Sequence, residues 1–275
     1  MTNTYEFCYQ CFVKNTFFAV NAMITSVLVC ELFFLYLRVR SNSFCCMYIK
    51  PASLKKMKLT KPTEEFITEI LELYSEENEL NENLLKLFKT FDDDKKKYDV
   101  LIKVASLNKI YSTAIVNINP VVEQINKISN FAKSNPKTIT EYVELVDQIS
   151  KVNWTNSKGK SFERNNLSFS SKYVHFLSDY KTPIYDSYIW IIIKGYLGQK
   201  NNENISFENP KNFKEFYTIF EKFKIDLNLE HYSNYDIDKF LWQYGKNLIS
   251  EIETEMSIDL EQAKSELKKR IKASR

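Results

Sequence analysis

Residues 167–190 read LSFSSKYVHFLSDYKTPIYDSYIW and give the strongest indication of the fold. Aromatic residues recur at spacings of three and four in the first half of this stretch, which predicts an amphipathic helix over 167–177. Pro183 interrupts this pattern, and a strongly apolar run follows it, so we expect a second helix over 184–197. The sequence therefore predicts two helices joined by a short polar turn.

The rest of the chain has the same helical character. Only four Gly and six Pro occur in 275 residues, which is too few turn-forming residues for an all-β protein. Thr138 and Glu141 form a capping-box pattern, whereas residues 92–97 (DDDKKK) indicate a solvated turn and residues 153–166 a polar loop. We predict an all-α fold with many helices in two lobes. Further helices are expected over 62–74, 83–91, 98–115, 120–132, 138–152, 211–223, 235–249 and 256–275.

Residues 1–56 differ in composition from residues 57–275. All five Cys lie in the first 46 residues, and residues 17–37 are mostly apolar, which is the length of a membrane span. Glu31 within that run would cost about 2–3 kcal/mol in a bilayer. Two interpretations stay open: an N-terminal apolar helix that anchors the protein with its body in the cytoplasm, or an upstream-translated extension. We favour the extension, with one helical cytoplasmic domain over 57–275.

The charge balance and the lack of certain motifs argue against several kinds of partner and cofactor site. Residues 57–275 contain 32 basic and 33 acidic side chains, so their net charge gives no indication of a polyanionic partner. The chain has no phosphate-binding loop and no dinucleotide fingerprint, so we expect no cofactor. His175 and His231 are the only histidines, and the Cys spacing does not fit a zinc module, so we expect no metal site.

Lys172 and Asp186 are the candidate catalytic residues. If 167–177 is a helix, Lys172 lies beside its aromatic face, where partial burial would lower the pKa of the amine and make it a nucleophile. Asp186 opens the second helix and could assist proton transfer or stabilise positive charge. The structural alternatives are a lysine whose stem covers the core and an aspartate that caps the helix.

The order of SFSSKYVHFL, a short break and PIYDSYI resembles the catalytic region of the helix-hairpin-helix DNA glycosylase superfamily. The nearest similarity is to its 8-oxoguanine glycosylase-like branch. The resemblance implies a two-lobed helical fold in which Lys172 attacks C1′ of a damaged nucleoside, forms a Schiff base and allows strand cleavage. It also implies that Asp186 supports the charge at C1′, and that the flipped base enters a pocket between two helical lobes.

A local basic segment is the candidate DNA-binding region. Residues 151–181 have a net charge of +4, with Trp154 and Phe162 among the basic residues, and this combination suits contacts with phosphates and bases. It would replace the Gly-rich turn of the family, because Gly159 is the only glycine here. The alternative is a solvated loop. The predicted DNA contacts are Lys158, Lys160, Arg164 and Ser171.

Three hypotheses follow from these features. The first is a DNA base-excision glycosylase and lyase, which requires Lys172 and Asp186 to face one pocket. The second is a non-enzymatic helical module that binds DNA or protein, with those two side chains apart or blocked by aromatic residues. The third is a membrane-tethered helical protein, which requires residues 1–56 to be translated and inserted. The damaged base and the oligomeric state are not specified by the sequence.

Overall fold

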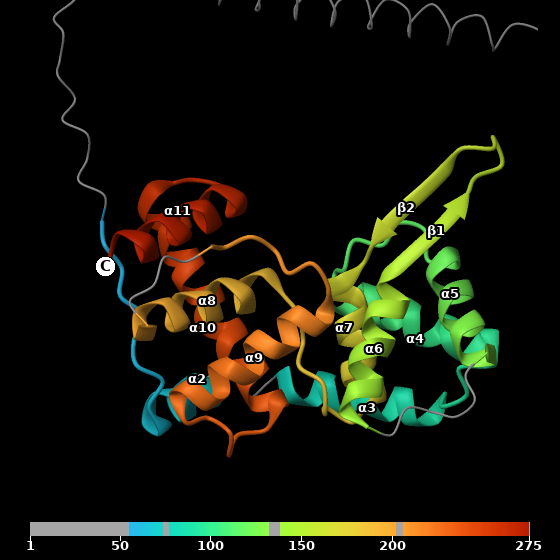
Figure 1. Ribbon diagram of the computed structural model, residues 1–275, viewed down its shortest axis with the longest axis horizontal. Coiled ribbons are helices and arrows are strands. Elements are labelled where there is room, and N and C mark those ends of the chain that lie inside the picture. The colour runs from blue at the N-terminus through green and yellow to red at the C-terminus, as the bar shows by residue number, and fades with distance from the viewer. Residues whose placement is uncertain (1–54, 74–76, 132–137, 202–205, 275) are drawn as a thin grey trace, which may run out of the picture. The chain divides into compact units, whose positions relative to one another are not determined.

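The structure is a computed structural model that describes residues 55–73, 77–131, 138–201 and 206–274 (Figure 1). The apolar segment predicted over 17–37 and its proposed helix lie outside the described residues. Within the described ranges, no helix is both long and apolar enough to cross a membrane.

The described residues form helices and one antiparallel hairpin, which confirms the predicted all-α fold class. The helices are α2 (Glu64–Leu73), α3 (Glu77–Thr90), α4 (Lys97–Ile110), α5 (Asn119–Phe131), α6 (Ile139–Ser150), α7 (Leu167–Leu177), α8 (Ser187–Asn201), α9 (Phe213–Leu227), α10 (Asn234–Met256) and α11 (Leu260–Ala273). The hairpin consists of β1 (Lys151–Thr155) and β2 (Ser161–Asn165).

Capping residues define several helix ends. Thr138 and Glu141 form the predicted capping box at the start of α6. The side chains of Ser233 and Asp259 accept hydrogen bonds from backbone N–H groups that open α10 and α11. Asn228 ends α9 in the left-handed conformation, which lets the chain reverse toward α10.

The helices pack into two groups, which we call the N-lobe and the C-lobe. The N-lobe contains α3 to α7. The C-lobe contains α2 and α8 to α11, with α2, α8 and α11 packed against the long helix α10 and α9 packed against α8. Contacts between α6 and α9 join the lobes, and their buried apolar residues form one continuous core. Gly245 lets α10 approach α8 closely, because a Cβ there would lie 3.2 Å from Ile192 and Tyr188. The turn between α7 and α8 connects the two lobes.

The polar segment 153–166 was predicted to be a loop, and that prediction was wrong. Residues 151–165 form a hairpin that projects from the helices (Figure 1), with Trp154 opposite Phe162. Asn156 and Gly159 make the turn, and Gly159 adopts a φ of 76°. Residues 151–155 (KVNWT) do alternate between polar and apolar types, but residues 161–165 (SFERN) contain a single apolar residue, so only half of the hairpin carries the pattern by which strands are recognised.

Candidate functional site

A pocket of about 380 Å³ lies where the N-lobe meets the C-lobe. Its walls come from α3, the C-terminal end of α4, α7, the start of α8, and α10. Lys172 and Asp186 both line it, although they belong to different lobes. The side chains singled out from the sequence are thus brought together in one concave site.

Lys172 is a buried amine with three neighbours in the pocket. The residue is 5% exposed, and its Nζ donates to Ser168 Oγ at 2.8 Å. Nζ lies 3.5 Å from Asp186 Oδ2 and 5.7 Å from the centre of the Tyr111 ring. Burial lowers the pKa of Lys172 below its ordinary value, while the carboxylate of Asp186 opposes part of this shift. Lys172 therefore combines a weakened ammonium form with direct access to the pocket.

Asp186 has two roles, one for each carboxylate oxygen. Oδ1 accepts from the backbone N–H of Tyr188 at 2.9 Å, which caps α8 as the structural alternative anticipated. Oδ2 faces Lys172 across the ion pair. The cap thus fixes the orientation of the oxygen that faces the amine.

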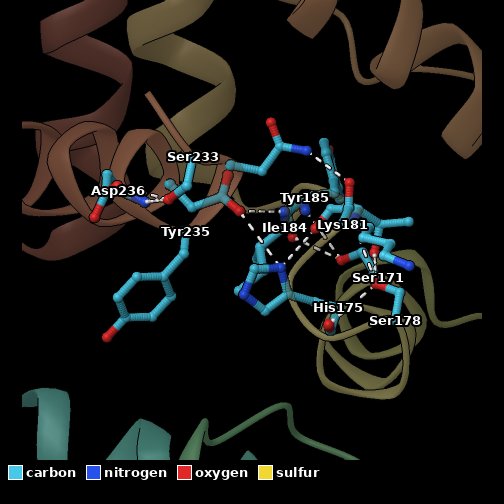
Figure 2. Close-up of polar contacts among 12 residues, drawn as sticks. Ser171, His175, Ser178, Lys181, Ile184, Tyr185, Ser233, Tyr235 and Asp236 are labelled. Atoms are coloured by element: carbon cyan, nitrogen blue, oxygen red, sulfur yellow. Dashed lines mark hydrogen bonds and ion pairs between the residues drawn. The ribbon is translucent and has the colours of Figure 1, made fainter. Parts of the chain in front are cut away.

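The turn before Asp186 is held by side chains of α7. Figure 2 shows Ser171, His175 and Ser178 directed toward the segment that contains Ile184 and Tyr185. Ser171 Oγ accepts from the N–H of Tyr185 at 3.0 Å. Ser171 is fully buried, so its position does not support the predicted contact with DNA. Its hydroxyl instead ties the helix of Lys172 to the turn of Asp186.

His175 and Asp238 form a buried polar pair at the floor of the pocket. His175 Nδ1 lies 2.5 Å from the Thr182 carbonyl, which can only accept, so Nδ1 has the proton. Asp238 Oδ2 accepts from the N–H of Ile184 at 2.7 Å and lies 3.8 Å from Nδ1. Among the described residues, neither His175 Nε2 nor Asp238 Oδ1 has a hydrogen-bond partner. Two buried polar atoms therefore lack the hydrogen bond that would offset the cost of their burial.

The environment of this pair determines its protonation. Burial, assisted by the nearby Lys172, lowers the pKa of His175 to about 4 despite the opposing hydrogen bond to Thr182. Burial raises the pKa of Asp238 well above its usual range, against the opposing effects of the Ile184 amide, Lys172 and Lys224. His175 is therefore neutral near pH 7.

We expect His175 to make folding sensitive to acid. Its pKa is about 4 when folded and 6.5 when unfolded, so below pH 6.5 the unfolded chain binds the extra proton. The free energy of unfolding should fall by about 3 kcal/mol between pH 6.5 and 4 from this group alone. Urea unfolding at several pH values, comparing the wild type with His175→Asn, measures the difference.

Other groups titrate in the wild type and in the His175→Asn variant alike. The difference between the two slopes of unfolding free energy against pH therefore isolates the contribution of His175. Burial raises the pKa of Asp238, which changes the free energy of unfolding with pH in the opposite sense, so the comparison is repeated with Asp238→Asn in both chains. Equal slopes with and without the His175→Asn substitution would contradict a buried, neutral imidazole.

The side chains on the opposite wall of the pocket are connected by a chain of hydrogen bonds that links the two lobes. Tyr111 OH donates to Asn81 Oδ1 at 2.7 Å, and Asn81 Nδ2 donates to Tyr235 OH at 3.2 Å. Asn78 Oδ1 accepts from Tyr235 OH and from Lys239 Nζ. This chain sets the Tyr111 ring over Lys172 and links α3 to α10.

The predicted DNA-binding residues other than Ser171 lie on the hairpin. Lys158 and Lys160 are exposed at its turn, and Lys160 Nζ lies 5.3 Å from the centre of the Phe162 ring. Trp154 and Phe162 stack at 5.2 Å with an interplanar angle of 10°. Arg164 donates to the carbonyl of Ala114 at 3.1 Å, so it also fixes the hairpin to the N-lobe. None of these side chains lines the pocket.

Sequence reasoning missed Asp238 as a site residue and treated His175 as a core or rim residue. Asp238 lies more than fifty residues from Lys172 in the chain, and it occurs in a helix whose apolar spacing gives no separate signal. Tyr111 and Trp242, which also line the pocket, resemble the many other core aromatics. In the part of the chain that is described, no group of three or more His, Cys, Asp or Glu could hold a metal ion.

Part of the chain is similar to a known protein family. Residues 63–181 match the model of a family described as HI_0787_N, N-terminal domain. The match covers less than half of the chain and spans α2, the N-lobe and the hairpin, so it includes Lys172 and ends before Asp186. No curated protein and no solved structure matches the chain.

Proposed function

We propose that this chain is a DNA glycosylase with lyase activity that uses Lys172 as the nucleophile and Asp186 as the assisting carboxylate. The observation that supports it best is the position of Lys172 Nζ, which lies 3.5 Å from Asp186 Oδ2 within one pocket. The non-enzymatic alternative expects these side chains apart or blocked, and their shared pocket of about 380 Å³ favours the enzyme.

The chemistry begins with the neutral amine of Lys172. Its nitrogen forms a bond to C1′ while the bond from C1′ to the base breaks, and the base leaves with the electron pair and takes up a proton. Opening of the sugar ring then gives a protonated Schiff base between Lys172 and C1′. Asp186 Oδ2 is close enough to stabilise the positive charge at each stage. Strand cleavage follows by elimination of the 3′ phosphate after loss of a proton from C2′.

The pocket suits a single extruded nucleobase. Its volume of about 380 Å³ lies at the small end of ligand sites, which fits one ring system rather than a longer ligand. Tyr111 and Trp242 supply aromatic faces for stacking. His175 and Asp238 also line the pocket and place polar side chains near the edge of the base. Aromatic walls with a polar floor are the arrangement by which a flipped base is recognised.

The hairpin supplies the contact with the DNA backbone in this proposal. Lys158 and Lys160 are exposed at the turn, where they can bind phosphates. The stacked rings of Trp154 and Phe162 hold the two strands of the hairpin together. Because residues 57–275 are near neutral overall, binding would depend on this local patch. The proposal keeps the cytoplasmic location expected from the sequence, and membrane attachment would require residues 1–56.

The test is the pH dependence of covalent trapping by borohydride, which reduces a Schiff base to a stable amine. Duplexes with an abasic site or an oxidised base are the substrates. Because burial lowers the pKa of Lys172, trapping should reach half its maximal rate below pH 10.5. The carboxylate of Asp186 raises the pKa of Lys172, so Asp186→Asn should move this midpoint to lower pH.

Asp186→Asn should also slow trapping by about 10²–10⁴-fold, because it removes the assisting carboxylate. A midpoint that moves to higher pH would contradict the proposed pairing of the two groups. The absence of an adduct on every substrate at every pH would remove the lyase and favour the non-enzymatic module.

A further inference from the structure

A carboxylate from α10 holds the turn that leads into Asp186. Asp238 Oδ2 accepts from the backbone N–H of Ile184 at 2.7 Å, two residues before Asp186. Asp238 and Ile184 are both buried, and a buried backbone N–H requires an acceptor within the protein. The conformation of this turn therefore depends on a side chain more than fifty residues away in the sequence.

Two side chains of α7 hold the same turn from the other lobe. His175 Nδ1 donates to the Thr182 carbonyl, and Ser171 Oγ accepts from the N–H of Tyr185 at 3.0 Å (Figure 2). Both belong to the helix that contains Lys172, whereas Asp238 belongs to α10. The turn is thus fixed by α7 on the N-lobe side and by Asp238 on the C-lobe side.

These contacts set the distance between the two candidate catalytic groups. The hydrogen bond from the Tyr188 N–H orients the Asp186 carboxylate within α8, but it does not fix the start of α8 relative to Lys172. Lys172 Nζ lies 3.5 Å from Asp186 Oδ2, and a displacement of about 1 Å in a catalytic site can cost about 100-fold in rate. The contacts of the turn are therefore the ones that keep Asp186 beside the amine.

Asp238 also acts on Lys172 through its charge. The carboxylates of Asp186 and Asp238 both raise the pKa of Lys172, against the larger effect of burial, which lowers it. A substitution that removes the carboxylate of Asp238 changes both the charge and the hydrogen bond to Ile184. The two effects are separable, because asparagine has no charge but keeps an oxygen that accepts a hydrogen bond.

We propose that Asp238 is a positioning residue that holds the turn between α7 and α8, so that the Asp186 carboxylate stays beside the Lys172 amine. This inference rests on the proposed function. Asp238 takes no part in bond making in this role and acts only through Asp186. Its hydrogen bond to Ile184 makes the geometry of the reacting pair depend on the packing of α10.

The test compares Asp238→Ala with Asp238→Asn by borohydride trapping over a range of concentrations of an abasic duplex, which has no base for Asp238 to contact. Asp238→Ala should lower the maximal rate by at least about tenfold and leave the half-saturating DNA concentration within about twofold. Asp238→Asn should trap within about threefold of the wild type, because it keeps the acceptor for Ile184. When Asp186→Asn is added, the two Asp238 variants should trap at equal rates.

Asn234→Ala is the matched control. Asn234 also lies on α10 and donates to the same turn, at the Lys181 carbonyl at 2.6 Å, but this contact is five residues before Asp186. Its trapping rate should stay within about threefold of the wild type. Asp238→Glu provides the test if Asp238→Ala does not fold, because it keeps the charge but displaces the acceptor. It should slow trapping, whereas a role of the charge alone predicts the wild-type rate.

A second readout does not require the chemistry. Because the Asp186 carboxylate raises the pKa of Lys172, an NMR titration of the Lys172 Cε signal reports their pairing. The midpoint should lie at lower pH in Asp238→Ala than in Asp238→Asn, and adding Asp186→Asn should remove this difference. Equal trapping rates and equal midpoints for the two Asp238 variants would overturn the positioning role and leave the glycosylase proposal intact. No wild-type adduct on any substrate, together with the lower midpoint of Asp238→Ala, would overturn the glycosylase proposal alone.

Discussion

Lys172→Gln should abolish covalent trapping on every substrate that the wild type traps. The glutamine side chain can still hydrogen-bond to Ser168, but its amide nitrogen is not a nucleophile and forms no Schiff base. Release of the base should also slow by at least about 100-fold, because the variant has no amine to displace the base from C1′. Gel separation of protein–DNA adducts and chromatography of free base measure the two effects independently.

The control for this experiment is Lys181→Gln. Lys181 is an exposed lysine nine residues further along the chain, in the turn between α7 and α8, and its side chain lines no part of the pocket. It should trap DNA at the wild-type rate. Continued trapping by Lys172→Gln, with the same yield as the control, would show that another amine is the nucleophile.

Asp94→Asn should cause a large loss of stability. Lys103 is completely buried in the N-lobe, and its ammonium pairs with Asp94 Oδ1 beside the rings of Phe88 and Tyr173. Tyr173 OH also donates to this oxygen at 2.7 Å. Removing the carboxylate leaves a buried positive charge without its partner, which costs about 3–5 kcal/mol. Calorimetry should show a melting temperature lower by about 10 °C.

Two further variants separate charge from packing. Tyr173→Phe removes one hydrogen bond to Asp94 and should cost only about 1 kcal/mol. The double variant Asp94→Leu with Lys103→Met removes both charges and should recover most of the lost stability. A melting temperature for Asp94→Asn within about 2 °C of the wild type would contradict a buried, paired ammonium.

The sequence was sufficient for the parts of the site that depend on local structure. Helical spacing predicted α7, Pro183 marked the turn before α8, and the capping preference of aspartate placed Asp186 at the helix start. Lys172 and Asp186 are close because only a short turn separates their helices, so nearby sequence fixes their proximity. The resemblance to the glycosylase superfamily remains a prediction.

The rest of the site depends on contacts between distant segments. Tyr111, Asp238 and Trp242 reach the pocket only because α4 packs beside α7 and α10 packs beside α8, and single-sequence periodicity does not specify such pairings. Asp94 illustrates the same limit in the core. The segment 92–97 is a turn before α4, as predicted, but the partly buried side chain of Asp94 reaches Lys103 instead of solvent. The hairpin was missed because the alternation of polar and apolar residues in 151–155 is short and residues 161–165 do not continue it.

The proposed reaction is defined most directly by which atom of the protein becomes bonded to DNA. Wild-type protein should be trapped with borohydride on an abasic duplex, digested, and its peptides sequenced by mass spectrometry. We predict that the mass of the reduced sugar is found on Lys172 alone. An adduct on Lys239, the other lysine that lines the pocket, or on any other amine would contradict the assignment of Lys172 as the nucleophile.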